Sequence, residues 1–267
     1  MNPDGTNQRV LATGPNRDIG LAGELSWVGK TGLLMTNERI SGHSYMTFDT
    51  AKAPFNRTVS DGNDAAFTRS LAIPGGMGGD GLAVSRDGST AMWMIRTSHN
   101  PSSWVLTVRS AAVAALSGQS ANGFGNVLLT EGRDFNRGFS MSPDSNFFVI
   151  SLKIGEGYDL FLKDTSSGQT IRRLTTTGEN NGALNHYPDV SPSGKWVAFS
   201  VRKGIGTKAD LHMVKTDGTD LRQVTATESV DEDRPSWSPD GKELAYQRLD
   251  DADPESGWDV YAIRVPN

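Results

Sequence analysis

One short pattern recurs five times along this chain of 267 residues, and a repeat of this kind restricts the fold more than any other feature of the sequence. Each copy has an apolar stretch, a turn sequence such as Ser-Pro-Asp-Gly, and a second stretch that is apolar at nearly every position. Proline presets the first corner of a tight turn, and aspartate and glycine tolerate the conformations that follow. Each copy therefore predicts a β-hairpin. The copies begin at Gly23, Asp80, Arg137, His186 and Asp233.

Further apolar stretches follow each hairpin. The second strands are apolar at successive positions, as in 147–150, which indicates burial on both faces. Four strands per copy with both sheet faces covered are typical of a propeller blade. We therefore expect an all-β chain that forms a β-propeller of five four-stranded blades. The third strands are expected from Ser44, Ser103, Tyr158, Ala209 and Trp258, and the fourth from Asn56, Asn126, Arg172 and Arg222.

The last copy stops after three strands, and the N-terminal segment supplies a candidate for the fourth. The sequence from Pro3 matches that from Thr216, including an Asp-Gly-Thr turn. We expect residues 1–14 to form the outer strand of the last blade and to close the ring, because closure removes an exposed sheet edge. The expected single domain, 1–267, has blades at about 23–60, 80–130, 137–177, 186–227 and 233–267 plus 1–14.

Composition excludes several classes of function. The 30 glycines and 12 prolines favour turns over helices, and a net charge of −5 gives no attraction for a phosphate backbone, so we expect no nucleic-acid partner. No apolar run approaches the roughly 20 residues that span a bilayer, and the N-terminus lacks the regions of a signal peptide. Zero cysteines exclude disulfides and thiolate nucleophiles. We expect a monomer without membrane insertion and without a signal peptide in this chain.

The sequence "RPSWSPDGKELAY…WDVYAIRV", together with "VKTDGTDLRQVTAT", resembles the TolB-type (WD-like repeat) β-propeller family. The likeness covers nearly the whole chain and is strongest in the last three copies. It is weaker in the first, where "VGKT" replaces "SPDG". The resemblance implies the propeller fold and a periplasmic or extracellular location. It implies no single activity, because propellers of this kind serve as protein-docking platforms, glycan-processing enzymes and gating domains of peptidases.

In a propeller, the residues that enter each first strand lie around the mouth of the central channel, where function is usually carried. Here they are mostly charged. They could form a solvated rim or a pocket for a polar ligand, in which Arg137 and Arg234 would bind carboxylates or backbone carbonyls. The candidate ligand-binding residues are Glu24, Asp80, Arg137, His186, Tyr187, Asp233 and Arg234.

We predict no cofactor and no metal centre. Asp251, Asp253 and Glu255 stand at alternate positions and resemble part of a calcium loop, but the full pattern of ligands is missing, so a solvated loop is favoured and calcium is the weaker alternative. A transition metal prefers several histidines together, and only four occur in the chain. They are His43, His99, His186 and His212, the last within a third strand.

These features favour a non-catalytic binding protein that presents a charged channel mouth to a protein segment or an oligosaccharide. The sequence contains no Gly-x-Ser-x-Gly nucleophile elbow. The alternative is a carbohydrate-active hydrolase or lyase that uses carboxylates such as Glu24, Asp80 and Asp233 in the same channel. A third interpretation, the gating domain of a peptidase, is disfavoured because the sequence has no hydrolase region.

Overall fold

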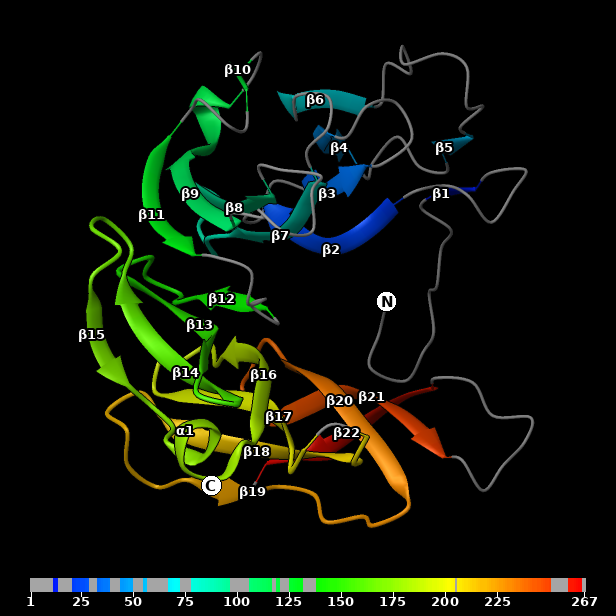
Figure 1. The fold of residues 1–267 in the computed structure, drawn as a ribbon. Coiled ribbons are helices and arrows are strands. Elements are labelled where there is room, and N and C mark those ends of the chain that lie inside the picture. Colours follow the sequence, from blue (N-terminus) through cyan, green and yellow to red (C-terminus); the bar gives the residue numbers. More distant parts are fainter. Residues whose placement is uncertain are drawn as a thin grey trace. The chain divides into compact units, whose positions relative to one another are not determined.

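The computed structural model describes the chain as an all-β protein (Figure 1). Within the described residues, helical structure is limited to α1 (Thr177–Asn181) and a short 3-10 turn at Val113–Ala115. The chain divides into two compact units, residues 1–133 and 134–267. The described residues are 12–13, 21–28, 33–38, 44–49, 55–56, 67–72, 78–96, 106–116, 119–120, 125–131, 138–204, 206–250 and 259–265.

The first sheet of unit 1 has four antiparallel strands in chain order, with a fifth, short strand parallel to the last. Its fourth strand is not at Asn56, as the sequence predicted. It is β6, which pairs with β4 from Ser44 opposite Ala72 to Phe48 opposite Phe67 and so satisfies nearly the whole backbone edge of β4. The strands are β2 (Leu21–Val28), β3 (Leu33–Glu38), β4 (Ser44–Asp49), β6 (Phe67–Ala72) and β10 (Gln119–Ser120).

The second sheet of unit 1 has the predicted antiparallel order, with each strand beside its neighbour in the sequence. The middle of its central strand β8 is fully buried: residues 91–95 are each at most 1% exposed. Burial of consecutive residues on both faces is what the run of apolar positions predicted. The strands are β7 (Gly78–Val84), β8 (Thr90–Arg96), β9 (Leu106–Ala112) and β11 (Asn126–Glu131).

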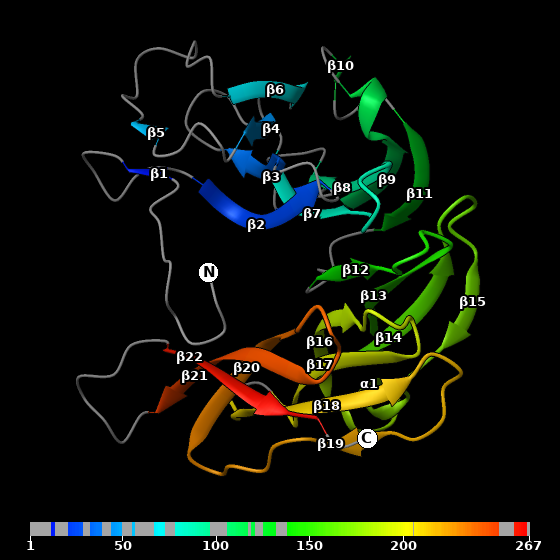
Figure 2. The same ribbon diagram turned by 180° about the vertical axis from the view of Figure 1, so that it is seen from behind.

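Unit 2 contains two four-stranded antiparallel arrays, joined by one parallel bridge between Tyr158 and Leu184, and a three-stranded sheet (Figure 2). Apolar residues from the first two arrays, including Leu160 and Phe199, form a common buried core. The strands are β12 (Phe139–Met141), β13 (Phe147–Ile154), β14 (Gly157–Asp164), β15 (Thr170–Arg173), β16 (Leu184–Val190), β17 (Trp196–Arg202), β18 (Ala209–Lys215), β19 (Arg222–Gln223), β20 (Val230–Trp237), β21 (Glu243–Asp250) and β22 (Asp259–Arg264).

The predicted closure by the N-terminal segment is not confirmed. Among the described residues, β22 pairs with β21 and with no other strand, and the two described residues of the N-terminal segment, β1 (Ala12–Thr13), pair with β5 (Phe55–Asn56). Val260 of β22 is 77% exposed, whereas Leu211, at the same place in β18, is fully buried. Five complete blades in a closed ring therefore remain an expectation from the sequence.

The predicted hairpin turns share one hydrogen-bond pattern in the four copies that the structure describes. The turn serine accepts a hydrogen bond on Oγ from the amide five residues later, at 2.9 to 3.1 Å. The residue three positions after the serine is left-handed in every case, which glycine adopts without steric cost. The turn serines are Ser85, Ser142, Ser191 and Ser238, and the left-handed residues are Gly88, Ser145, Gly194 and Gly241.

Candidate functional site

In the two four-stranded arrays and the three-stranded sheet of unit 2, an irregular residue lies in the first strand or directly before it, always four residues before the turn serine. These residues are Gly138, Tyr187 and Arg234, with φ values of 99°, 51° and 54°. The pairing register shifts after His186 in β16 and after Asp233 in β20, which marks a β-bulge in each strand. A bulge redirects a side chain, and left-handed backbone at residues other than glycine stores strain that concentrates at functional sites.

The three irregular residues contact one another in order, and we call them the bulge row. The guanidinium carbon of Arg234 lies 4.2 Å from the centre of the Tyr187 ring, and Arg234 Nη2 donates a hydrogen bond to the Tyr187 hydroxyl over 3.2 Å. On the other side, a Cβ atom at Gly138 would lie 3.2 Å from Tyr187 Cα. Glycine at position 138 therefore allows Tyr187 its close approach, and the row runs from the residue before β12 across β16 to β20.

Arg234 brings an exposed positive charge to the bulge row. Its backbone amide donates to Ser200 Oγ over 3.0 Å, which ties the bulge to β17. Among the described residues, no carboxylate forms an ion pair with its guanidinium. The adjacent carboxylate of Asp233 is buried and lies 3.3 Å from Arg202. The guanidinium of Arg234 is thus stacked and oriented by Tyr187, and no described residue other than Tyr187 occupies its donors.

Arg202 at the end of β17 neutralises two buried carboxylates of β20. It binds Asp231 through both terminal nitrogens, at 2.7 and 2.9 Å, and also contacts Asp233. Burial disfavours the charge on Arg202, but Asp231 and Asp233 outweigh this effect and raise the pKa of Arg202 above its ordinary value. Since the amide of Ala209 also donates to Asp231, this cluster joins β17, β18 and β20. It fixes β20, the strand that carries Arg234, against β17 and β18.

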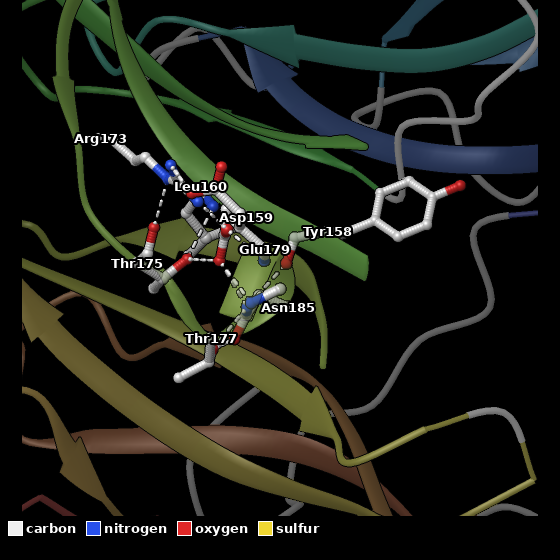
Figure 3. A network of polar contacts seen from close by, with 9 residues as sticks. Tyr158, Asp159, Leu160, Arg173, Thr175, Thr177, Glu179 and Asn185 are labelled. Atoms are coloured by element: carbon white, nitrogen blue, oxygen red, sulfur yellow. Dashed lines mark hydrogen bonds and ion pairs between the residues drawn. The ribbon is translucent and has the colours of Figure 1, made fainter. Parts of the chain in front are cut away.

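A second buried network lies behind β16, around the fully buried Asp159 (Figure 3). The carboxylate of Asp159 accepts five hydrogen bonds at 2.6 to 3.1 Å, two of them from amides at the start of α1. A carboxylate with this many donors fixes all the elements that supply them. The donors are Arg173, Thr175, Gly178, Glu179 and Asn185.

The Asp159 network positions an aromatic group next to the bulge row. Tyr158 precedes Asp159, and its ring points away from the network (Figure 3). The ring meets His186 edge to face, with ring centres 4.9 Å apart, and His186 meets Tyr187 at 6.0 Å in the same geometry. Aromatic rings in this arrangement stabilise one another beyond the area that they bury. Tyr158 and His186 therefore support Tyr187 from within unit 2.

The structure brings four of the seven predicted site residues together. Tyr187 and Arg234 touch, His186 is buried beneath them, and Asp233 is buried beside Arg202. Glu24 and Asp80 lie in β2 and β7 of unit 1, and His212 lies in β18 against Phe199. Within the described residues, no group of three or more metal-binding side chains could hold a metal ion. The positions Arg137, Asp251, Asp253, Glu255, His43 and His99 lie outside the described residues.

Sequence reasoning missed Gly138, Ser200 and the carboxylate of Asp189, which also joins the first strands of unit 2. One signal could have found the bulge row. Aligning the copies on the turn serine places Gly138, Tyr187 and Arg234 in one column, and proline follows the last two. Such a column indicates a recurrent backbone irregularity, but it gives no information about which side chains meet across strands.

Comparison with known proteins points to one fold. No protein-family model matches the chain. The Tol-Pal system protein TolB of Xylella fastidiosa is 27% identical over 106 residues, which cover 40% of this chain and 23% of that protein. A solved structure of a putative TolB from Agrobacterium tumefaciens superposes with a TM-score of 0.61 at 17% identity, and covers 91% of this chain and 76% of its own. The chain has a TolB-like β-propeller fold.

Proteins with other activities share this TolB-like fold. An oligogalacturonate lyase in complex with manganese superposes with a TM-score of 0.59 at 12% identity, and covers 87% of this chain and 59% of its own. A puromycin hydrolase superposes with a TM-score of 0.58 at 15% identity, and covers 91% of this chain and 37% of its own. Identities this low show the fold alone. The match to TolB of Xylella fastidiosa spans less than a quarter of that protein's length.

Proposed function

We propose that this chain is a non-catalytic binding propeller that holds a segment of a partner protein against the bulge row, with Arg234 receiving a carboxylate of that segment. The observation that carries this proposal is the exposed guanidinium of Arg234, stacked on Tyr187 and without an ion-pair partner among the described residues. An arginine can bind a carboxylate through two parallel hydrogen bonds, which gives both affinity and orientation.

The geometry favours binding because the Arg234 side chain is already ordered in the free protein. The Tyr187 ring and hydroxyl hold the Arg234 side chain, so less conformational entropy is lost when a ligand binds. Aromatic and arginine side chains are also the residues that most often dominate the binding energy of protein interfaces. The left-handed backbone at both residues stores strain, which is tolerated where position matters more than stability.

The likeness to a Tol-Pal system protein supports protein interaction over other functions of this fold. On the same basis we propose that the protein acts in the periplasm or outside the cell. In the part of the chain that the structure describes, no helix is long and apolar enough to cross a membrane. An oligosaccharide as ligand, and carbohydrate cleavage at the same site, are the alternatives that the experiment below separates from peptide binding.

The proposal is tested by selecting peptides from a random display library on the immobilised full chain. Peptides bound by the wild type should be enriched in aspartate and glutamate, and their amide analogues with asparagine and glutamine should bind at least about tenfold more weakly, because a charge-assisted hydrogen bond is lost. Arg234→Glu should lose binding. Lys242→Glu, an equal charge change at an exposed turn residue of the same sheet, should leave binding unchanged.

Three results would count against the proposal. Selection of peptides without an acidic preference would remove the role of Arg234. Equal loss of affinity in Arg234→Glu and Lys242→Glu would show only a general charge effect, which added salt would abolish. Binding or cleavage of oligogalacturonate, with no acidic peptide selected, would favour the carbohydrate alternative.

A further inference from the structure

The carboxylate of Asp189 joins the first strands of the two four-stranded arrays and of the three-stranded sheet of unit 2. Asp189 lies in β16 and accepts a hydrogen bond from Ser140 Oγ of β12 over 3.0 Å and from the amide of Trp237 in β20 over 2.8 Å. The indole nitrogen of Trp237 donates to the backbone carbonyl of Asp189 over 3.1 Å. Ser140 Oγ in turn accepts from the amide of Val190. These four hydrogen bonds connect β16, through Asp189 and Val190, to β12 on one side and to β20 on the other.

Within the part of the chain that the structure describes, no cation compensates the carboxylate of Asp189. Although Asp189 keeps part of its surface exposed, its carboxyl group is enclosed by protein, and burial is the largest influence on it. β12 contributes no titratable side chain, and Asp189 pairs with Ala198 of β17. None of the charged or titratable groups on the adjoining strands is a partner of Asp189. These groups are His186 and Tyr187 of β16, Lys153 of β13, Tyr158, Asp159, Lys163 and Asp164 of β14, Arg202 of β17, and Asp231, Glu232, Asp233 and Arg234 of β20.

We propose that Asp189 is a positioning residue that works as a pH-responsive clasp: its carboxyl group sets β12, β16 and β20 against one another and thereby sets Tyr187 against Arg234. Asp189 lies two residues after Tyr187, and its partner Trp237 lies three residues after Arg234. Tyr187 in β16 and Arg234 in β20 are therefore each close in sequence to a residue of the clasp. As a regulator of ligand binding, the clasp rests on the function proposed above, but its structural effect does not.

The clasp changes its charge within the range of ordinary environmental pH. Burial raises the pKa of Asp189 to about 6, and the hydrogen bonds from Trp237 and Ser140 oppose part of that rise. Below this pH the carboxyl group is neutral and holds the strands without a buried charge. Above this pH the carboxyl group is charged, and two hydrogen-bond donors only partly compensate for the water that an exposed carboxylate would bind. The buried charge therefore makes the separation of β16 from β20 easier. The bulge row should be held most firmly in mildly acidic solution.

The test is an NMR titration of the full chain without ligand, from pH 5 to pH 7.5. The amide and indole signals of Trp237 and the Nε signal of Arg234 should shift together with a midpoint near 6. After correction for intrinsic exchange, the protection of the Trp237 amide against hydrogen exchange should fall about tenfold across this range, as a pKa raised from 3.8 to about 6 requires. Asp189→Asn should abolish both responses.

Two further variants keep the proposal falsifiable if Asp189→Asn does not fold. Ser140→Ala retains the carboxyl group but removes one hydrogen bond to it, so the midpoint at Trp237 should move upward. His186→Gln should leave the Trp237 titration in place, because the titrating group is Asp189.

A flat Trp237 signal, or a titration lost in His186→Gln, would overturn the clasp. A Trp237 titration beside an unchanging Arg234 signal would overturn the coupling to the bulge row. Failure to select acidic peptides would leave each of these results unchanged.

Discussion

The amide of Leu160 donates a hydrogen bond to the hydroxyl of Thr175 over 2.9 Å, and Leu211 and Thr225 form the same bond at the same length in the next array. In both arrays the amide of the residue before the threonine donates back to the leucine carbonyl. The threonine hydroxyl thus takes the place of a backbone acceptor where the fourth strand ends. This recurrent bond explains why the repeat carries threonine after an apolar residue in this strand.

Replacing Thr175 by valine should therefore destabilise unit 2. Thr175 is 3% exposed, and its hydroxyl also donates to Asp159 over 2.7 Å, so the change leaves a buried amide and a buried carboxylate short of a partner. We expect a loss of about 2 kcal/mol in the free energy of unfolding, measured by urea denaturation. Thr175→Ser keeps the hydroxyl and should lose less. Equal losses in the two variants would assign the effect to packing and not to the hydrogen bonds.

Among the four described turns, Ser145 is the one residue that departs from glycine at the left-handed position. Its φ is 62°, and its hydroxyl is buried without a hydrogen-bond partner among the described residues. Ser145→Gly should raise the free energy of unfolding by up to about 1 kcal/mol, because relief of steric strain and of the unsatisfied hydroxyl exceeds the added chain entropy. The reverse change at an equivalent site, Gly194→Ser, should lower it by a similar amount. Thermal unfolding of both variants measures this, and a shift of the same sign in both would contradict the explanation.

Arg202 should not be replaceable by lysine. It binds Asp231 through two nitrogens and contacts Asp233, and both carboxylates are buried. A lysine carries a charge but cannot make the two parallel bonds, so Arg202→Lys should cost about 1 to 2 kcal/mol, whereas Arg202→Met should cost about 3 to 5 kcal/mol because two buried charges lose their partner. Lys242→Met removes an exposed ion pair and should change stability by less than about 0.5 kcal/mol. The losses are measured by denaturant unfolding. If Arg202→Met lost no more unfolding free energy than Lys242→Met, the cluster of Arg202, Asp231 and Asp233 would contribute no stability.

Asp189 should make the free energy of unfolding fall as the pH rises through the acidic range, the opposite of the usual effect of an aspartate. Its pKa is raised from 3.8 to about 6, so between these values the folded chain binds more protons than the unfolded chain. This group therefore lowers stability as the pH rises, by about 2 kcal/mol between pH 4 and pH 7, and has little further effect above pH 7. The difference in unfolding free energy between wild type and Asp189→Asn isolates the effect from other carboxylates. A difference that does not vary with pH would contradict it.

Much of the local structure could be predicted because it depends on neighbouring residues. The hairpin turns follow from serine, proline, aspartate and glycine at fixed spacing, and the buried second strands follow from unbroken apolar runs such as residues 91–95. The position of the fourth strand after β4 was wrong. The segments "NRTVS" from Asn56 and "FTRSLA" from Phe67 both mix apolar or β-branched residues with polar ones, so their local preferences are similar. Only the long pairing of β6 along β4 distinguishes them.

The sequence alone determined that the chain is an all-β repeat protein with a TolB-like pattern, because period, turn residues and apolar runs are local properties. It also placed charged and aromatic residues at the start of the first strands. Only the tertiary structure decided which of them act together. Tyr187 and Arg234 are 47 positions apart, and their contact depends on two bulges and on the bridge through Asp189 between different strands. Such contacts arise from the packing of whole sheets, and no local preference specifies them.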